Sequence, residues 1–159
     1  MATARTRDLA VVGWREWVAL PDWGVPWTKA KIDTGARTSA MHAFDLESFE
    51  REGVPWIRFV VHPWQRSASD GVPVEAPLVG SKEVRSSSGA ASSRPVVHTS
   101  IRLAGVATDV DITLTRRDEM GFRMLVGRQA LRGRFVVDPA RSYAGGKPPI
   151  DTRRRNRAP

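Results

Sequence analysis

Apolar and polar side chains alternate with a period of two residues along much of the chain, which is typical of half-buried strands. In residues 56–63, Ile57, Phe59 and Val61 share one face, while Arg58 lies on the other. The same alternation marks 25–32, 97–103 and 110–114. Shorter apolar runs indicate further strands at 11–20, 78–85, 122–126 and 134–139.

Glycine and proline separate these segments, and the sequence predicts little regular secondary structure besides the strands. Residues 128–132 fit one or two turns of helix, 65–77 read as a loop, and we expect little structure after Ser142. A polar segment, 45–53, precedes the strand at 56–63. Many short strands with one short helix predict an all-β barrel or sandwich.

The 159 residues are enough for one domain that buries a core without disulfides. We place it at residues 10–143, with an N-terminal tail at 1–9. A flexible, Arg-rich tail is expected at 144–159.

Charge narrows the choice of partners. The chain carries 25 Lys and Arg against 17 Asp and Glu, a formal net charge of +8, and 21 of the cations are Arg. Arg favours carboxylates and phosphates, so acidic partners are expected. The C-terminal Arg cluster suggests nucleic acid only weakly, because a basic chain end is more often simply solvated.

Composition also excludes several classes of site and location. Cysteine is absent, which rules out thiol catalysis and Cys-based zinc sites. No apolar run has the length of a signal or membrane-spanning segment, so we expect a cytoplasmic protein without membrane contact. The sequence predicts no cofactor and no metal.

The candidate chemistry centres on Asp33-Thr34-Gly35-Ala36, at the end of a predicted strand. Gly35 is expected to allow backbone angles that a Cβ resists, and its N–H to approach the Asp33 carboxylate. One carboxylate cannot act on both sides of a peptide bond. We therefore expect two copies of the turn to meet across a two-fold axis.

Residues 86–93 form the segment of lowest complexity, rich in Ser, Gly and Ala, between two predicted hairpin arms. A disordered surface loop and a mobile cover over a cleft both fit this composition.

The turn at Asp33, followed much later by Leu125-Val126-Gly127 and a short helix, resembles the signature of retropepsin-like aspartic proteases. In that family a single domain forms a homodimer, each copy contributes the Asp of its turn, and a hairpin forms a flap over the substrate. The resemblance implies a closed β-barrel, the half-domain of an acid protease. It implies a catalytic Asp33, supporting residues and flap residues, which are Thr34, Gly35, Ala36, Leu125, Val126, Gly127, Ser86, Ser87, Ser88 and Gly89.

Three longer blocks, at 13–18, 29–43 and 117–131, are similar to the bacterial family labelled putative ATP-dependent zinc proteases, or RimK/LysX-associated proteins. The similarity extends from about Val12 to Tyr143. No phosphate-binding glycine loop occurs, so the ATP of that label is assigned to an associated ATP-grasp ligase. In this family's setting, such ligases add amino acids, often glutamate, to protein C-termini.

The residues give little support for the zinc ion that the family label names. The three histidines, His42, His62 and His98, are widely spaced, and no His-Glu-x-x-His motif occurs. We expect His42 to be a packed residue and His62 a surface residue at the end of a strand.

The sequence thus predicts an aspartic-type peptidase that acts on acidic, glutamate-tailed peptides or proteins. Four arginines near the two motifs are candidates for binding substrate carboxylates, although a single Arg is more often a surface residue: Arg37, Arg85, Arg123 and Arg128. A non-catalytic peptide-binding or regulatory partner of a RimK-type ligase is the main alternative. A zinc peptidase is the third.

Overall fold

The computed structural model describes residues 8–64, 70–85, 89–115 and 121–155, and the all-β class is confirmed. Within these ranges the chain forms eleven strands and three short helices. The strands are β1 (Ala10–Val12), β2 (Arg15–Leu20), β3 (Val25–Asp33), β4 (Ser39–His42), β5 (Phe44–Arg51), β6 (Val54–Val61), β7 (Val72–Arg85), β8 (Ala91–Leu103), β9 (Val106–Thr115), β10 (Met124–Gly127) and β11 (Phe135–Val137). The helices are η2 (Pro21–Trp23, 3₁₀), α1 (Arg128–Leu131) and α2 (Ile150–Arg155).

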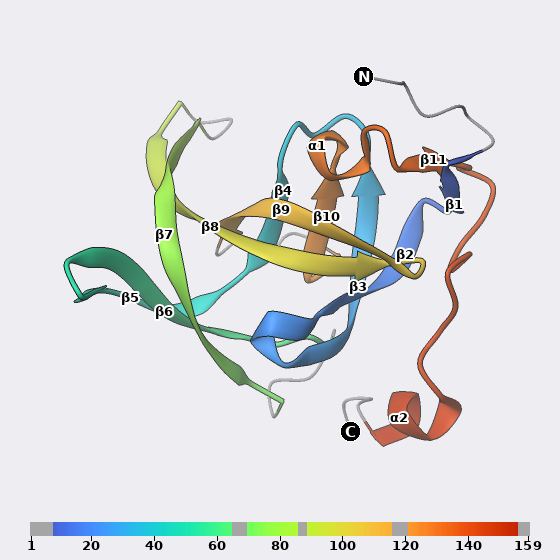
Figure 1. The fold of residues 1–159 in the computed structure, drawn as a ribbon, viewed down its shortest axis with the longest axis horizontal. Coiled ribbons are helices and arrows are strands. Elements are labelled where there is room, and N and C mark those ends of the chain that lie inside the picture. The colour runs from blue at the N-terminus through green and yellow to red at the C-terminus, as the bar shows by residue number, and fades with distance from the viewer. Residues whose placement is uncertain (1–7, 65–69, 86–88, 116–120, 156–159) are drawn as a thin grey trace.

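Nine strands form one sheet in the order β2-β3-β10-β4-β9-β8-β7-β6-β5 (Figure 1). An additional pairing joins β2 to β8, so the six strands from β2 to β8 in this order complete a circuit. Strands β1 and β11 pair separately and in parallel. Most neighbours are antiparallel, but β10 is parallel to β3, which joins two segments far apart in the sequence.

The core lies on the faces that the alternation predicts. Ile57, Phe59 and Val61 are at most 2% exposed, and Trp23 packs edge-on against Phe59 with ring centroids 5.2 Å apart. Alternate residues of β8 and β9 are buried in the same way, namely Val97, Thr99, Ile101, Leu103, Val110, Ile112 and Leu114.

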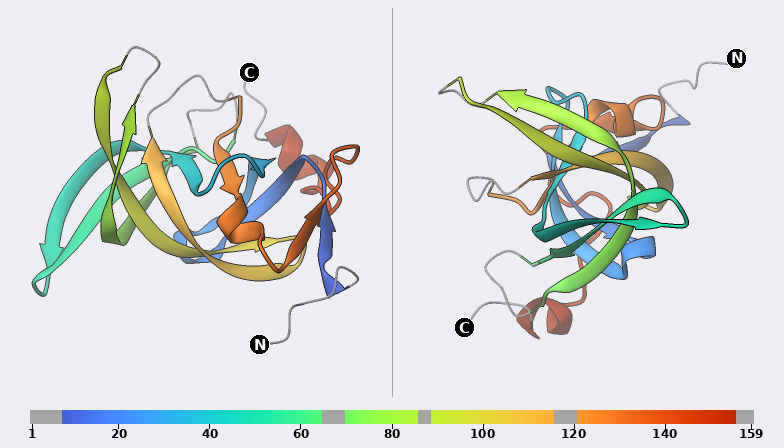
Figure 2. Two further views of the ribbon diagram at one scale, coloured as in Figure 1. Left: turned by 90° about the horizontal axis from the view of Figure 1, so that it is seen from above. Right: turned by 90° about the vertical axis from the view of Figure 1, so that its left-hand side faces the viewer.

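Two hairpins, β5–β6 and β7–β8, project from the body (Figure 2). The predicted loop at 65–77 is wrong from Val72 onwards, because residues 72–77 belong to β7 and pair with β6. Pro73 and Pro77 suggested a loop, yet this half of β7 pairs with β6 alone, and β8 joins it only from Leu78. A strand with one free edge tolerates residues that lack an N–H donor.

The polar segment after His42 forms β5, the edge strand of the sheet. Its charged side chains face solvent, and Glu47 lies 3.8 Å from Arg58 of β6. Charged residues on an edge strand discourage pairing with other chains. The polar composition of this segment therefore belongs to an edge strand.

A buried carboxylate fixes the C-terminal part of the domain to β2. Glu16 is fully buried, and its Oε2 accepts the backbone N–H of Gly13 at 2.6 Å. Ala144 donates to Oε2 at 2.8 Å, and Gly145 donates to Oε1 at 2.9 Å. Because each bond is made to a charged acceptor, the loss of this side chain would leave buried donors unsatisfied.

The expectation of little structure after Ser142 is wrong for Ile150–Arg155, which form α2. The N–H of Arg153 reaches the carbonyl of Pro149 at 3.0 Å. Asp151 in the first turn suits the positive end of the helix dipole. In the described part of the chain, no helix has the length and apolar character needed to cross a bilayer.

Candidate active site

The Asp33 turn and the distant Leu125–Gly127 motif lie side by side. Strand β10 runs parallel to β3, with Val126 opposite Ile32 and Gly127 opposite Asp33. Both strands end at this point, as the parallel arrows in Figure 1 show. The carboxylate therefore lies where two paired strands end, each of which buries alternate residues in the core.

The carboxylate of Asp33 is oriented by its own turn. The N–H of Gly35 donates to Asp33 Oδ1 at 2.9 Å, and the N–H of Ala36 donates to the Asp33 carbonyl at 3.2 Å. Asp33 is partly buried, whereas Thr34 and Gly35 are exposed. The structure thus fixes one carboxylate oxygen at a surface formed by small residues.

Gly35 does not have the left-handed backbone that the sequence suggested. Its importance is spatial, because a Cβ at this position would lie 3.2 Å from Asp33 Oδ1. Such a contact is tight, so a side chain here would press on the carboxylate that Gly35 N–H binds.

Residues at the start of α1 donate hydrogen bonds to backbone carbonyls of the Asp33 turn. The N–H of Arg128 donates to the Ala36 carbonyl at 2.8 Å, and that of Gln129 to the Arg37 carbonyl at 3.1 Å. The guanidinium of Arg128 also donates to the Gly35 carbonyl at 3.2 Å. Backbone carbonyls of the turn are therefore satisfied by residues that follow β10 directly.

Gly127 and Ser39 complete the support. Gly127 N–H donates to Ser39 Oγ at 3.1 Å, and Ser39 is only 3% exposed. A Cβ on Gly127 would lie 2.5 Å from the Thr38 carbonyl oxygen. Sequence reasoning missed Ser39, although it falls on the small-residue segment directly after the turn.

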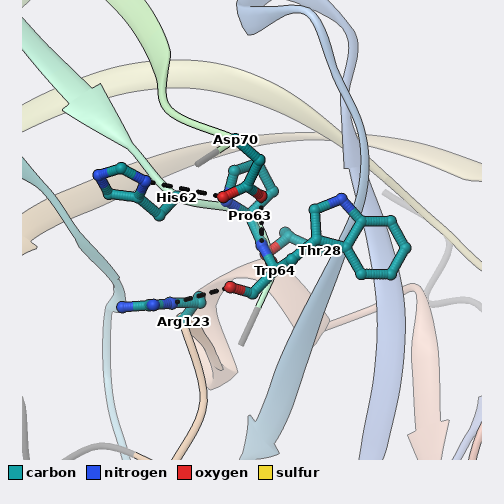
Figure 3. A network of polar contacts seen from close by, with 6 residues as sticks. All are labelled: Thr28, His62, Pro63, Trp64, Asp70 and Arg123. Atoms are coloured by element: carbon teal, nitrogen blue, oxygen red, sulfur yellow. Dashed lines mark hydrogen bonds and ion pairs between the residues drawn. The ribbon is translucent and has the colours of Figure 1, made fainter. Parts of the chain in front are cut away.

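The predicted substrate-binding arginines do not all gather at the turn. Arg37 and Arg128 lie there and are exposed. Arg123 precedes β10, at the opposite end from Gly127, and its Nε donates to the Trp64 carbonyl at 3.4 Å (Figure 3). Arg85 pairs through its backbone with Ala91 near the tip of the β7–β8 hairpin.

Arg123 belongs to a different polar network, drawn in Figure 3. Asp70 accepts the Trp64 N–H at 3.1 Å and lies 3.7 Å from His62 Nδ1. Thr28 in β3 donates to the Pro63 carbonyl at 2.8 Å. This network joins the segment after β6 to β3 and β10, so its evident role is structural.

The β7–β8 hairpin occupies the place in the chain expected for a flap. Gly89 has a φ of 83°, a left-handed conformation that favours glycine. Ser86, Ser87 and Ser88 lie outside the described residues. On the arm before them, Lys82 Nζ donates to Thr38 Oγ1 at 2.8 Å. Lys82 is not among the residues that the sequence predicts for the site.

The histidines do not assemble a zinc site. His42 is buried, as predicted, but His62 is only 19% exposed at its side chain and not a surface residue, because Asp70 and Phe44 cover it. His98 binds Asp111 on the outer face of β8 and β9. In the ranges that the structure describes, no group of three or more potential metal-binding side chains occurs.

Comparison with known proteins agrees with this geometry. A family model described as RimB-like, retropepsin-like aspartic endopeptidase RimB, matches residues 11–148. A protein of unknown function from Legionella pneumophila, Lpg0085, has a solved structure with a TM-score of 0.72 and 29% sequence identity, covering 86% of this chain and 98% of that one.

Curated relatives carry a different name. A probable alpha-L-glutamate ligase of Shewanella pealeana is 43% identical over 137 residues, covering 86% of this chain and 30% of the relative. One from Desulfotalea psychrophila, with the same name, is 38% identical over 144 residues, covering 89% and 31%. The chain thus spans less than a third of the length of these relatives.

Proposed function

Because this chain belongs to the RimB-like family of retropepsin-like aspartic endopeptidases, we propose that it is an aspartic-type peptidase that works as a pair of identical chains. Each chain contributes one Asp33. The observation that carries this proposal is the parallel register of β3 and β10, which sets Asp33 beside Gly127 with its carboxylate oriented by Gly35 N–H.

The surface around Asp33 suits a close two-fold contact. Thr34 and Gly35 are exposed and small, so the backbone of a second turn can approach without displacing a bulky side chain. Thr34 is then available to hydrogen bond across the axis. The paired carboxylates share one proton, because two negative charges at hydrogen-bond distance repel each other strongly.

The shared proton gives the two carboxylates different roles. The ionised Asp33 removes a proton from water, and the resulting nucleophile attacks the carbonyl carbon of the scissile peptide bond. The protonated Asp33 of the second chain donates its proton to the departing amine. No covalent intermediate with the protein forms, and the peptide bond is replaced by a carboxylate and an amine.

We further propose an acidic peptide or protein tail, such as one rich in glutamate, as the substrate. Arg37 and Arg128 are exposed at the turn, and no carboxylate in the described ranges forms an ion pair with either. Guanidinium groups in this setting attract carboxylates. The name of the curated relatives, which refers to glutamate ligation, is consistent with a glutamate-containing substrate.

Replacing Asp33 by Asn tests the mechanism. Asn keeps the shape but cannot act as acid or base, so cleavage of an oligoglutamate-tailed peptide should fall by at least about a hundredfold. Asp22→Asn, at an exposed position of η2, is the matched control and should cleave like the wild type. Unchanged cleavage by Asp33→Asn would exclude the aspartic mechanism.

Mixing the two proteins tests the pairing. If each active unit needs two intact Asp33 side chains, a threefold excess of Asp33→Asn should lower the activity per wild-type chain about fourfold after exchange of subunits. Activity that is indifferent to the variant would show that one chain acts alone. Sedimentation at the assay concentration gives the oligomeric state directly.

A second candidate function follows from the lengths of the relatives. Similar sequences form about 30% of proteins named glutamate ligases, so this domain also suits a non-catalytic, peptide-binding partner of such a ligase. Wild-type protein that binds an oligoglutamate peptide in a calorimeter but never cleaves it would favour this function over the peptidase.

A further inference from the structure

Lys82 brings a positive charge from the β7–β8 hairpin to the edge of the Asp33 turn. Its Nζ donates to Thr38 Oγ1 at 2.8 Å, although 44 residues separate the two in sequence. Thr38 lies directly above Gly127, whose missing side chain leaves room for the Thr38 carbonyl. The ammonium is therefore adjacent to the turn, and the residue remains exposed.

The position opposite Lys82 in the hairpin does not supply a negative charge. The residue directly opposite Lys82 on β8 is Arg94, which is itself a cation. No carboxylate in the described part of the chain pairs with Lys82.

The contact with Thr38 uses only part of the binding capacity of Lys82. An ammonium has three N–H donors, and Thr38 accepts one of them. A hydroxyl orients the ammonium without neutralising it, which leaves the charge available to a ligand at the turn.

We infer that Lys82 is a specificity-determining residue that binds a carboxylate side chain of the substrate next to the scissile bond. This inference rests on the proposed peptidase function. Thr38 positions the ammonium, and the β7–β8 hairpin places it beside any peptide that binds across Asp33. A glutamate side chain at that subsite displaces water from the ammonium and forms an ion pair with it. Glutamine has no charge and cannot form this ion pair.

The test compares two peptides that differ only by Glu or Gln at one position beside the cleaved bond. Lys82→Met should lower kcat/KM for the Glu peptide about three- to tenfold and leave the Gln peptide unchanged, as expected for an exposed charge pair. Lys147→Met makes the same change of charge at an exposed lysine that stacks on Tyr143, and should alter neither value. Equal losses on both peptides would overturn the inference, because they would mean that Lys82 only holds the hairpin in place.

Two further measurements separate charge recognition from positioning and from catalysis. Thr38→Val keeps the ammonium but removes the acceptor that positions it, so the preference for Glu over Gln should weaken by less than in Lys82→Met. Binding of the same peptides to Asp33→Asn, with and without Lys82→Met, tests the subsite even if the wild type cleaves neither peptide. Equal affinity of both variants for the Glu peptide would overturn the inference, whereas absent cleavage with a Lys82-dependent affinity would reject only the peptidase function.

Discussion

At the scale of single residues, Gly127 lies against the backbone of the turn with no room for a side chain. The Thr38 carbonyl oxygen would be 2.5 Å from a Cβ there, and the Ala36 carbonyl oxygen 3.0 Å. Both neighbours are backbone atoms, which cannot move aside as a flexible side chain can. The shape of the turn therefore depends on the absence of a methyl group on the next strand.

Gly127→Ala should lower the free energy of unfolding by about 1–3 kcal/mol, the usual cost of overpacking. It should also reduce peptide cleavage, because the displaced turn carries Asp33. Urea denaturation measures the first effect. Gly80→Ala is the control, since a Cβ at Gly80 meets nothing within 4 Å; equal stability of the two variants would contradict the packing argument.

At this scale the structure brings together residues that the sequence singled out, for partly different reasons than expected. Asp33 and Gly127 were identified from a motif, and the structure pairs them directly. Gly35 was expected to serve a special backbone angle but instead leaves space beside the carboxylate. Lys82 was missed because its contact with Thr38 joins segments whose proximity no local pattern indicates.

At the scale of elements, Glu16 connects β2 to the segment that follows β11. Its carboxylate accepts backbone N–H groups from Gly13, Ala144 and Gly145 while fully buried. These donors come from opposite ends of the domain. These bonds add to the backbone hydrogen bonds from Trp14 N–H to the Arg141 carbonyl and from Tyr143 N–H to the Arg15 carbonyl, which join the same two segments.

Glu16→Gln should lower the free energy of unfolding by about 2–4 kcal/mol, because the amide nitrogen of Gln faces N–H donors instead of accepting from them. Thermal or urea denaturation gives the value. Glu47→Gln is the matched control, since the Glu47 side chain is 66% exposed in its contact with Arg58, and should change stability by less than about 0.5 kcal/mol. A Glu16 variant as stable as this control would show that the buried bonds contribute little.

The alternation in the sequence predicted the central strands well, because each has one face in the core and one in water. It failed at β5 and the start of β7, where edge positions admit polar residues and proline. Arg123 shows a related limit. It is close to the second motif in sequence, but the length of the extended strand β10 separates it from Gly127 and the Asp33 turn.

At the scale of the whole molecule, the hydrogen-bond partners of Glu16 bear on where the domain ends at its C-terminal side. The sequence placed the boundary at Tyr143, whereas Ala144 and Gly145 bind the buried carboxylate and Pro148 is buried as well. We therefore propose that the folded unit continues to Pro149 and that α2 is an appendage.

Truncation tests this boundary. A chain that ends at Tyr143 should lose several degrees in Tm, because two hydrogen bonds to Glu16 disappear. A chain that ends at Pro149 lacks α2 but keeps both bonds, and should melt within about 2 °C of the full chain. If the two truncated chains have the same Tm, the domain boundary at Tyr143 is correct.

The long sequence distance between the turn and its support has a consequence for biosynthesis. Arg128 binds the Gly35 carbonyl across 93 residues. At ribosomal rates of roughly 5–20 residues per second, the turn is made about 5–20 s before the strand that fixes it. A nascent chain therefore presents the Asp33 turn before β10 and α1 can support it, and the proposed hydrolytic site is complete only once nearly the whole domain has left the ribosome.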